Sequence, residues 1–511
     1  MSTGTVLIAG AGPTGLVLAL SLTRQGVPVR IVDAAAGPGT TSRALAVQAR
    51  TLELYRQLGL TQAVLEGGHR VPAINLWVQG EHRARVPFES IGGELTAYPF
   101  LEIFPQDLHE ALLVERLGAL GVTVERRTEL TGFSEEGAGL RAVLKGPDGR
   151  ETSAQAAYLA GCDGARSRVR NLLGTGFPGG TYRQVFYVAD IDGGGPPVNG
   201  ELHIDLDESD FLAVFPLRGA GRARLVGIVR GERAEHAEAL TFGDVTGRAM
   251  QSLKLEVARV NWFSTYHVHH RVTEHFSKGR AFLLGDAAHI HSPAGGQGMN
   301  TGIGDAVNLA WKLAAVLNGE APPSLLDTYE PERMPFAERL VATTDRMFTF
   351  ATAEGPVADL IRTRLVPLIA PRALSFEAVR EFVFRTVSQI MVNYRGRPLS
   401  AGTLGEVHGG DRLPWVRTGD ADNYQSLEAI RWQVHVYGEP GTALADWCRE
   451  RSLALNVYPF TQAHQAAGLR RDGLYLLRPD TYLALVHPTP DPQVLARYFA
   501  ERGLRPGGMR P

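Results

Sequence analysis

The chain has few cysteines, no excess of charge and no long apolar run. Its two cysteines, Cys162 and Cys448, stand far apart among 511 residues, outside any CxxC pair or zinc-ligand spacing. A disulfide framework and a zinc site are therefore not expected, and a reducing cytoplasm is the predicted location. Lysine and arginine number 52 against 54 acidic residues, a balance that does not favour nucleic acid or an anionic membrane as a partner.

Membrane and targeting signals are also missing. After the apolar start of the chain, no later segment offers about 18 uncharged apolar residues, the minimum for a membrane span. The apolar start, Thr5 to Leu22, lacks a basic first region and contains glycines and a proline, unlike a signal peptide. What is present is an ordinary globular composition with 44% hydrophobic residues, at a length that indicates two or three domains.

The N-terminal segment carries a dinucleotide-binding pattern. Residues 5–9 predict a buried parallel strand, and a glycine-rich turn and an apolar helix follow it directly. Gly10 permits a tight turn, Gly12 lets the backbone approach a pyrophosphate, and Gly15 allows close helix packing. A second strand ends at Asp33, where an acid can bind a ribose. The predicted cofactor-binding residues of the turn are Gly10, Gly12, Pro13, Thr14 and Gly15.

Two later motifs have the same strand-then-turn form. A strand at Tyr158–Cys162 precedes an Asp-Gly turn, DGxxSxxR, that runs from Asp163 to Arg170. A third strand, Ala281–Leu284, runs into the sequence GDAAH, which contains Asp286. Either motif alone is typical of an ordinary turn or helix cap.

Together and in this order, the three motifs resemble the single-component FAD-dependent aromatic hydroxylases, the relatives of p-hydroxybenzoate and phenol hydroxylases. The resemblance covers residues from about 5 to 339. It implies an α/β fold: a Rossmann-like FAD-binding domain, an inserted antiparallel β-sheet substrate domain and a C-terminal thioredoxin-like domain. The expected boundaries are 1–175 and 276–395 for the FAD-binding domain with its helical linker, 176–275 for the substrate sheet, joined by residues of about 70–105, and 396–511 for the tail.

The resemblance also implies a set of contacts with noncovalently bound FAD. In it, Asp33 holds the adenosine ribose, although many relatives have Glu there, and Arg43 lies beside the cofactor. Gln106 lies near the ribityl-phosphate region, and Asp163 contacts FAD and supports the use of NAD(P)H. Asp286 binds a ribityl hydroxyl, a task that suits a carboxylate because it accepts charge-assisted hydrogen bonds.

A glycine-rich loop after GDAAH is the predicted centre of the chemistry. The resemblance places Pro293 at the flavin edge, with the N–H groups near Gly298 and Met299 facing flavin N1 and O2 and with Asn300 beside them. A helix predicted over Thr301–Leu317 has one apolar face. Its N-terminal dipole suits the negative charge of reduced flavin. The implied reaction is hydroxylation of a phenolic or polyketide-like aromatic molecule by O2 and NADH or NADPH, through a C4a-hydroperoxyflavin.

Several alternatives stay open. The group that deprotonates a phenol is one of five residues, none in a diagnostic motif: Tyr182, Tyr187, His203, Asp205 and His267. His289 and His291 lack metal-ligand companions, which favours structural or indirect roles. Other functions are a same-fold oxidase, a Baeyer-Villiger-type monooxygenase or a non-catalytic flavin-binding protein. A halogenase is disfavoured because no WxWxIP-like element is present, and the oligomeric state is a monomer or a homodimer.

The C-terminal part resembles the thioredoxin-like tail of phenol and polyketide hydroxylases, notably at Leu474–Ala484. Cys448 is its one cysteine. Because a dithiol reaction needs a pair of thiols, the tail is expected to serve packing or oligomerisation.

Overall fold

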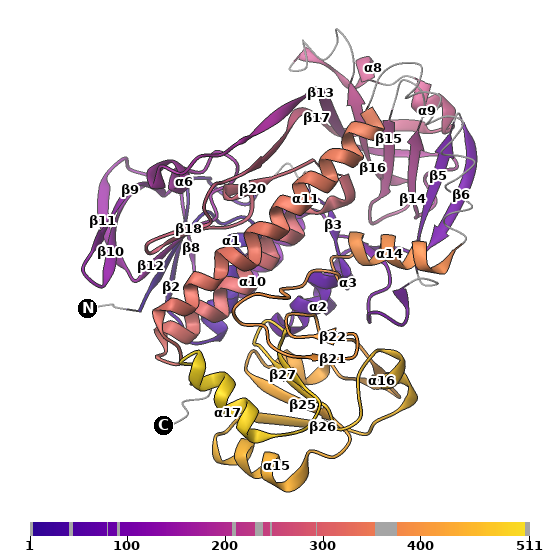
Figure 1. Cartoon of the computed structure of the whole chain (residues 1–511). Coiled ribbons are helices and arrows are strands. Elements are labelled where there is room, and N and C mark those ends of the chain that lie inside the picture. Colours follow the sequence, from indigo (N-terminus) through magenta and orange to yellow (C-terminus); the bar gives the residue numbers. More distant parts are fainter. Residues whose placement is uncertain are drawn as a thin grey trace.

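The computed structural model describes most of the chain (Figure 1). Arg43 and Pro293, two of the predicted site residues, lie outside the described residues. The described ranges are 4–39, 44–78, 80–88, 92–206, 211–229, 239–245, 248–292, 294–352 and 376–505.

A six-stranded sheet forms the centre of the predicted FAD-binding domain. Its order is β18-β19-β12-β1-β2-β8, and all neighbours pair in parallel except β18 with β19. Apolar runs make the central strands β1, β12 and β19 buried on both faces, as parallel strands inside a sheet require. The strands are β1 (Val6–Ala9), β2 (Val29–Asp33), β8 (Val124–Arg126), β12 (Tyr158–Gly161), β18 (Ser277–Lys278) and β19 (Ala281–Leu283).

Helices from distant parts of the sequence cover this sheet. The N-terminal helix α1 (Pro13–Arg24) packs against both α5 (Gln106–Ala119) and α10 (Gly298–Leu317). The longest helix, α11 (Tyr329–Thr352), runs from this domain toward the second sheet (Figure 1). The remaining elements here are α6 (Arg168–Leu173), η2 (Gly285–Ala287), η3 (Ala294–Gly296), η4 (Pro323–Thr328) and the hairpin strands β9 (Glu129–Glu136), β10 (Gly139–Lys145) and β11 (Glu151–Ala156).

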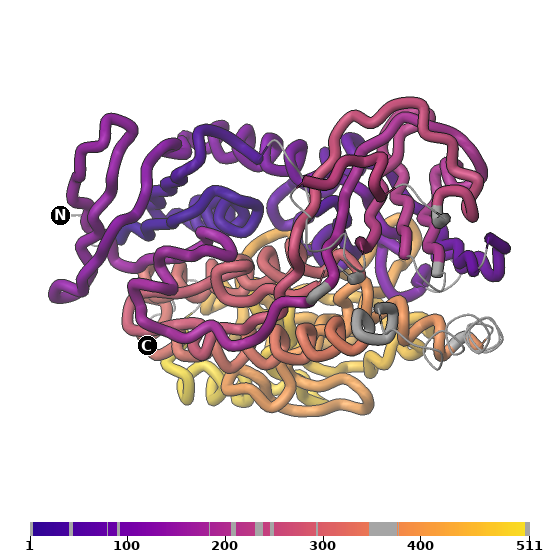
Figure 2. Tube along the Cα trace, turned by 90° about the horizontal axis from the view of Figure 1, so that it is seen from above, coloured from indigo at the N-terminus to yellow at the C-terminus, as the bar shows by residue number. Residues whose placement is uncertain are grey.

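The second sheet has eight strands in the order β20-β17-β13-β16-β15-β14-β5-β6. It was expected to be antiparallel, but β14 pairs with β5 in parallel, because β5 arrives from a much earlier part of the chain. Two long strands, β13 and β17, pair along most of their length and connect the two domains (Figures 1 and 2). The strands are β5 (Ala73–Val78), β6 (Glu81–Pro87), β13 (Gly179–Gly194), β14 (Leu202–Leu206), β15 (Phe211–Pro216), β16 (Arg222–Val229), β17 (Glu256–Val272) and β20 (His289–Ile290).

Each face of this sheet has its own cover. Short helices α8 (Phe242–Val245) and α9 (Arg248–Ser252) supply Phe242 and Met250 to an apolar cluster on one face. The other face meets α11 and a small sheet between the domains. That region contains β3 (Ala46–Val47), β4 (His69–Val71), β7 (Leu101–Ile103), α2 (Ala49–Leu58), α3 (Thr61–Gly67) and α14 (Glu377–Val387).

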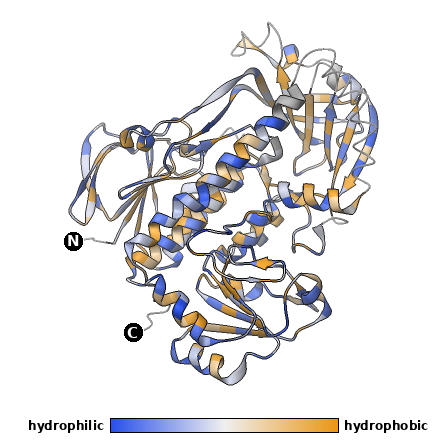
Figure 3. Cartoon of the chain, viewed as in Figure 1, coloured by the Kyte–Doolittle hydropathy of each residue, from blue (hydrophilic) through white to orange (hydrophobic). Residues whose placement is uncertain are grey.

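The C-terminal part folds as a four-stranded mixed sheet, β26-β25-β27-β28, with the β-α-β-α-β-β-α order of a thioredoxin-like fold. Figure 3 shows its apolar strands beside helices of mixed hydropathy. Its core also includes Trp311 and Ala315 of α10, so the tail shares a core with the FAD-binding domain. Its elements are β21 (Thr403–Leu404), β22 (Val407–His408), β23 (Arg417–Thr418), β24 (Ala421–Asp422), η6 (Gln425–Glu428), β25 (Gln433–Tyr437), α15 (Gly441–Glu450), β26 (Ala454–Tyr458), α16 (Gln462–Ala466), β27 (Leu474–Leu477), β28 (Leu483–His487) and α17 (Pro492–Glu501).

Within the described ranges, no helix has both the length and the apolar character needed to cross a bilayer.

Candidate active site

The glycine-rich turn joins β1 to α1. Gly10 has φ +102°, and a Cβ on it would lie 2.2 Å from the carbonyl oxygen of Cys162. A Cβ on Gly15 would lie 2.0 Å from the carbonyl oxygen of Gly10. Both glycines are therefore required by the protein itself. A Cβ on Gly12, in contrast, would meet no atom of the described residues within 4 Å, so these residues leave open space at the turn.

That open space lies at the N-terminus of α1, where Gly12 supplies no side-chain cap. The first N–H groups of a helix have no intrahelical partner and suit an anion. Asp33 lies beside them and accepts hydrogen bonds from the N–H groups of Ala11 and Ala35, both at 2.7 Å. The turn and the acid thus have the arrangement that a pyrophosphate and a ribose need.

The three sequence motifs are in contact with one another, the first and the third at Thr14. A Cβ added to Gly285, in the GDAAH motif, would lie 2.7 Å from Thr14 Oγ1, and one added to Gly302 of α10 would lie 2.3 Å from it. In the Asp-Gly motif, Arg170 donates a hydrogen bond of 2.9 Å to the carbonyl oxygen of Ala287. The fold therefore brings together the segments that the sequence analysis connected only by resemblance.

Asp163 makes its described contacts with α6. Its carboxylate accepts hydrogen bonds from the Ser167 hydroxyl at 2.5 Å and from the N–H groups of Arg168 and Val169 at 2.7 and 3.0 Å. These contacts identify it as a cap for the start of α6. Its contact with FAD stays a prediction.

Asp286 and Gln106 lie in different settings. Asp286 is exposed, although Gly285 and Ala287 on either side of it are buried. The amide of Gln106 donates to Glu110 at 2.8 Å, and Glu110 also accepts from the N–H of Gly39 at 2.8 Å. An exposed carboxylate beside the glycine-rich turn suits a hydroxyl-bearing ligand.

Sequence reasoning missed Asp305, a buried acid within the apolar helix α10. Its carboxylate accepts from His289 Nε2 at 2.7 Å, from Arg333 Nε at 2.6 Å and from the N–H of Gly285 at 3.0 Å. Burial opposes ionisation, but Arg333 and His289 outweigh it and lower the pKa of Asp305. The signal available in the sequence was a charged residue within a largely apolar helix. The hydrogen bond to Asp305 favours a structural role for His289.

The loop before α10 turns on two glycines with positive φ, Gly295 at +76° and Gly296 at +62°. The helix itself begins at Gly298, three residues before the predicted start. Gln297 supplies no side-chain cap. The N–H groups of Gly298 and Met299 therefore belong to the unpaired first turn, as the predicted flavin contact requires.

Asn300 anchors this loop with its side chain. Its Oδ1 accepts from the N–H of Gln48 at 2.9 Å and from Thr51 Oγ1 at 2.7 Å, and its Nδ2 donates to the carbonyl oxygens of Ala46 and Gly296. With its side-chain amide so occupied, the contact of Asn300 with a ligand stays a prediction for its backbone N–H. Gln48, another residue missed in the sequence, donates to the carbonyl oxygen of Gly295.

His291 presents a buried acceptor to the same loop. Its Nδ1 lies 2.8 Å from the carbonyl oxygen of Ser292, which fixes the proton on that nitrogen. Its Nε2 is buried and has no partner among the described residues, and it lies 3.7 Å from where a Cβ on Gly298 would be. Burial lowers the pKa of His291 to about 4, so the ring is neutral at pH 7.

The structure separates the five candidates for phenol deprotonation. Paired residues of neighbouring strands project from one face. Tyr187 itself lies in the apolar cluster under α8 and α9. The residues paired with His203, Asp205 and His267 on the neighbouring strands also belong to that cluster. The candidates on that face are Tyr187, His203, Asp205 and His267.

Tyr182 belongs to the other face. It packs with Phe186 and Phe211, and Phe215 of the same strand packs in a cluster with Ala46. A Cβ on Gly296 would lie 2.7 Å from the Cβ of Ala46. This face of the sheet is therefore the one that meets the glycine-rich loop.

No cluster of three potential metal ligands occurs among the described residues.

Comparison with known proteins agrees with this geometry. The family described as "FAD binding domain" matches residues 3–344. The 6-methylpretetramide 4-monooxygenase of Streptomyces rimosus is 36% identical over 516 residues, 94% of this chain and 90% of its own. Among solved structures, the OxyS anhydrotetracycline hydroxylase from Streptomyces rimosus has a TM-score of 0.77 at 29% identity, covering 99% of this chain and all of its own. Aklavinone-11 hydroxylase, in a ternary complex with FAD and aklavinone, has a TM-score of 0.79 at 25% identity, covering 98% and 99%.

The chain belongs to this FAD-binding family. It is an FAD-dependent aromatic monooxygenase. The expectations about family, fold class, enzyme class and FAD are thus confirmed.

Proposed function

We propose that this enzyme hydroxylates a fused-ring phenolic substrate of the aromatic polyketide type, with O2 and NADH or NADPH as co-substrates. The observation that carries the proposal is the uncapped first turn of α10 at Gly298, opposite the sheet face that contains Phe211 and Phe215. We propose that a flat aromatic ring binds between them. Support for the ring type comes from the relatives, whose names specify 6-methylpretetramide, anhydrotetracycline and aklavinone.

The residues that we propose to hold FAD come from neighbouring segments of the FAD-binding domain. The open turn at Gly12 and the α1 N-terminus would bind the pyrophosphate, with Asp33 on the adenosine ribose and Asp286 on the ribityl chain. The N–H groups of Gly298 and Met299 would lie at the pyrimidine edge of the flavin. Bound and reduced, FAD supplies the chemistry that activates O2. The proposal also includes Arg43, Gln106, Asp163, Pro293 and the backbone of Asn300.

The N-terminus of α10 would favour the electron-rich form of the flavin, because a helix N-terminus carries about half a positive charge. The neutral His291 adds an acceptor at the same edge without adding charge. Packing of Phe211 and Phe215 would exclude water from the reacting atoms, which strengthens every electrostatic interaction there.

Tyr182 is the candidate for handling the substrate's phenolic proton. Its hydroxyl donates to Asp345 Oδ1 at 2.5 Å, and His270 Nδ1 lies 3.8 Å from the same oxygen. Burial and the hydrogen bond to Asp345 raise the pKa of Tyr182. The tyrosine therefore stays protonated and would act as a relay: its oxygen accepts the phenol proton while its own proton moves to Asp345.

The proposed setting is the cytoplasm, where NAD(P)H is available, with the chain as a monomer or a homodimer. Both cysteines are buried and unpaired, as this setting permits.

Substrate screening with labelled oxygen tests the proposed function. Fused-ring phenols and simple phenols are incubated with the FAD-loaded enzyme, NAD(P)H and ¹⁸O2. The expected result is faster NAD(P)H oxidation with a fused-ring phenol and a product that gains one labelled oxygen on an intact ring. A ring-expanded lactone would indicate a Baeyer-Villiger reaction, and NAD(P)H oxidation that no aromatic compound accelerates would contradict the proposal.

A Tyr182→Phe variant tests the relay separately. Its FAD affinity should be unchanged, while hydroxylation slows by roughly 10²–10⁴-fold, the usual contribution of a proton transfer. Raising the pH should restore part of the rate for a substrate whose phenol ionises in solution. A Tyr187→Phe variant, on the other face of the sheet, is the matched control and should hydroxylate normally. Equal rates in the two variants would remove Tyr182 from the mechanism.

A further inference from the structure

The thioredoxin-like part meets the FAD-binding domain through a buried layer of charged residues. At its centre, Arg478 forms two hydrogen bonds to Glu332 of α11, at 2.7 and 2.9 Å, and two to Asp480, at 2.9 and 2.6 Å. All three side chains are at most 2% exposed. Charges buried this deeply are tolerated only when they are fully paired and hydrogen-bonded.

This layer holds one side of α10. Glu332 Oε2 accepts from Lys312 Nζ and from Asn308 Nδ2, both at 2.8 Å. Asp480 Oδ2 accepts from the indole N–H of Trp311 at 3.1 Å. Residues 308, 311 and 312 lie on one face of the helix because they are three or four positions apart. The C-terminal part is therefore bonded to α10 directly through Trp311, and through Glu332 of α11 to Asn308 and Lys312.

The loop between β27 and β28, which contains Arg478 and Asp480, also contacts α2. Thr481 Oγ1 accepts from the guanidinium of Arg50 at 2.7 Å, and the carbonyl oxygen of Asp480 accepts from it at 3.3 Å. One residue earlier, the carbonyl oxygen of Pro479 accepts from Gln57 Nε2 at 2.8 Å. The loop between β27 and β28 is thus bonded to both helices.

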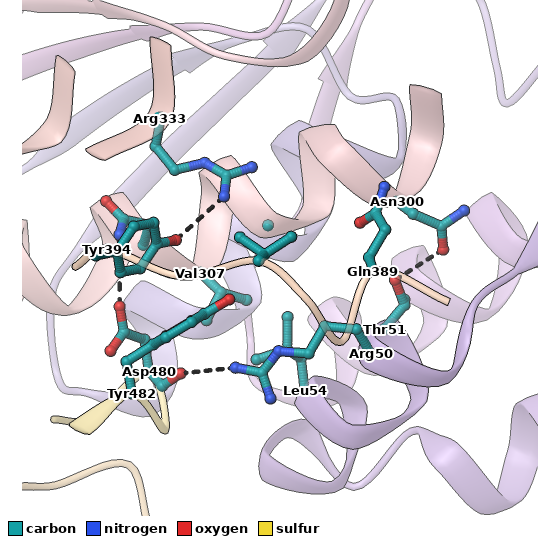
Figure 4. A pocket seen from close by; sticks show the side chains of 13 residues that line it. Arg50, Thr51, Leu54, Asn300, Val307, Arg333, Gln389, Tyr394, Asp480 and Tyr482 are labelled. Atoms are coloured by element: carbon teal, nitrogen blue, oxygen red, sulfur yellow. Dashed lines mark hydrogen bonds between the residues drawn. The ribbon is translucent and has the colours of Figure 1, made fainter. Parts of the chain in front are cut away.

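These two helices are the ones that hold the glycine-rich loop. Asn300 in the first turn of α10 is bonded to Gln48 and Thr51 at the start of α2, and Gln48 also holds the carbonyl oxygen of Gly295. Figure 4 shows Asn300 and Thr51 on one side of a small cavity and Asp480 and Tyr482 on the other.

That cavity has a free volume of about 20 Å³, enough for roughly one water molecule. It is too small for a flavin or an aromatic substrate, so it is no part of the substrate site. Its size shows that the contact between tail and helices is closely packed. Because packed interfaces resist continuous deformation, a displacement of the tail loop would move α2 or α10 with it.

Thr481 adds a sign of strain at the point of contact. Its φ is +70°, a conformation that is unfavourable for a β-branched residue. Such strain persists where the surrounding structure imposes it, and it often occurs at functional contacts. Here the threonine keeps the hydroxyl that binds Arg50, which glycine would lack.

We propose that the loop Arg478–Tyr482 of the thioredoxin-like part is a positioning element of the flavin site, which braces α2 and α10 and so fixes the N–H groups of Gly298 and Met299. The inference rests on the proposed contact of those groups with FAD. It gives the tail a role in the hydroxylation reaction that requires no cysteine chemistry.

Thr481→Gly separates positioning from stability. It removes the hydroxyl that binds Arg50 but relieves the positive φ, so the two effects on the unfolding temperature oppose each other and the protein should stay folded. We expect FAD dissociation to change by roughly two- to thirtyfold, the range of coupling carried by such networks. The visible absorption bands of bound FAD should shift, and more NAD(P)H should end as H2O2. Thr481→Ser keeps the hydroxyl and should behave like the wild type.

Ser452→Gly is the matched control. Ser452 also has a positive φ of +55°, and it is exposed in the same domain, so its replacement should leave the flavin unchanged. Two results would overturn the bracing role: wild-type FAD affinity and spectrum in Thr481→Gly, or equal impairment in Thr481→Ser. Gly298→Ala distinguishes the two proposals. If Gly298→Ala alters the flavin and Thr481→Gly does not, the bracing fails; if Gly298→Ala has no effect, the proposed FAD contact fails.

Discussion

The start of α10 and its middle are both polar regions of one helix, but they use their hydrogen-bonding groups in opposite ways. In the middle, Glu332, Arg478 and Asp480 bond to one another and to side chains of the helix. At the start, the helix is uncapped, and His291 Nε2 has no partner in the described part of the chain. Since buried polar groups are normally satisfied, satisfied groups indicate structure and unsatisfied ones indicate a ligand.

The comparison predicts that substitutions in the ion-pair layer act mainly on folding. Arg478→Met removes four hydrogen bonds and leaves Glu332 and Asp480 as buried charges with fewer partners. We expect a loss of about 3–5 kcal/mol in the free energy of unfolding, measured by urea denaturation. Arg449→Met, in an exposed ion pair with Asp446, should change it very little. Similar losses of unfolding free energy in both variants would contradict the structural role of the buried ion-pair layer.

Substitutions at the cofactor crevice should act on binding instead. Asp286→Ala removes a charged acceptor from the proposed ribityl site and should weaken FAD binding by about 1.5–3 kcal/mol. Because Asp286 is exposed, the unfolding of the FAD-free protein should be unaffected. Titration of FAD fluorescence measures the first effect and thermal unfolding the second. A correctly folded variant with normal FAD affinity would remove Asp286 from the binding site.

The cofactor part of the fold could be predicted from local sequence. Strand, glycine turn and helix at residues 5–22 follow from short-range rules, and the six-stranded sheet places β1 beside β2 and β12 as a Rossmann-like domain requires. The parallel pairing of β14 with β5 could not be predicted, since it joins segments more than 120 residues apart with no local signal. Strand pairing at that distance depends on tertiary packing.

The site could be predicted only in part, for a related reason. Gly10 and Asp33 belong to a local motif and could be proposed from it, whereas Asp305 and Gln48 act through partners far away in the sequence. The choice among the five proton-transfer candidates depended on which sheet face each occupies. A one-residue shift in strand register reverses that face, so the sequence alone could not resolve it.

Gly298→Val would sharpen the comparison at the start of the helix. Unlike Gly10, Gly298 has room for a Cβ among the described residues, where the nearest atom would be His291 Nε2 at 3.7 Å. We therefore expect the substitution to act mainly on the ligand. Oxidised FAD should still bind, while the misplaced N–H groups weaken stabilisation of the reduced flavin by about 1 kcal/mol. Product formed per NAD(P)H should fall and H2O2 should rise. Normal coupling and a normal flavin potential would contradict the proposed contact of the Gly298 and Met299 N–H groups with the flavin.

The smallest effect is expected at Cys448, which tests whether the tail acts by packing alone. Burial raises the pKa of the Cys448 thiol to about 11, so the thiol is protonated at pH 7 and a poor nucleophile. Cys162, the other cysteine, is buried in the FAD-binding domain. Cys448→Ser places a hydroxyl in the apolar core shared with Trp311 and should cost about 1 kcal/mol of stability. Cys448→Ala, which adds no polar group, should cost a similar amount or less. Turnover and coupling should be normal in both variants. Loss of turnover in a stable, FAD-loaded Cys448→Ala protein would show that the tail takes part in the chemistry. The distinction between the structural ion-pair layer at the middle of α10 and the reactive glycine-rich loop at its start would then be wrong.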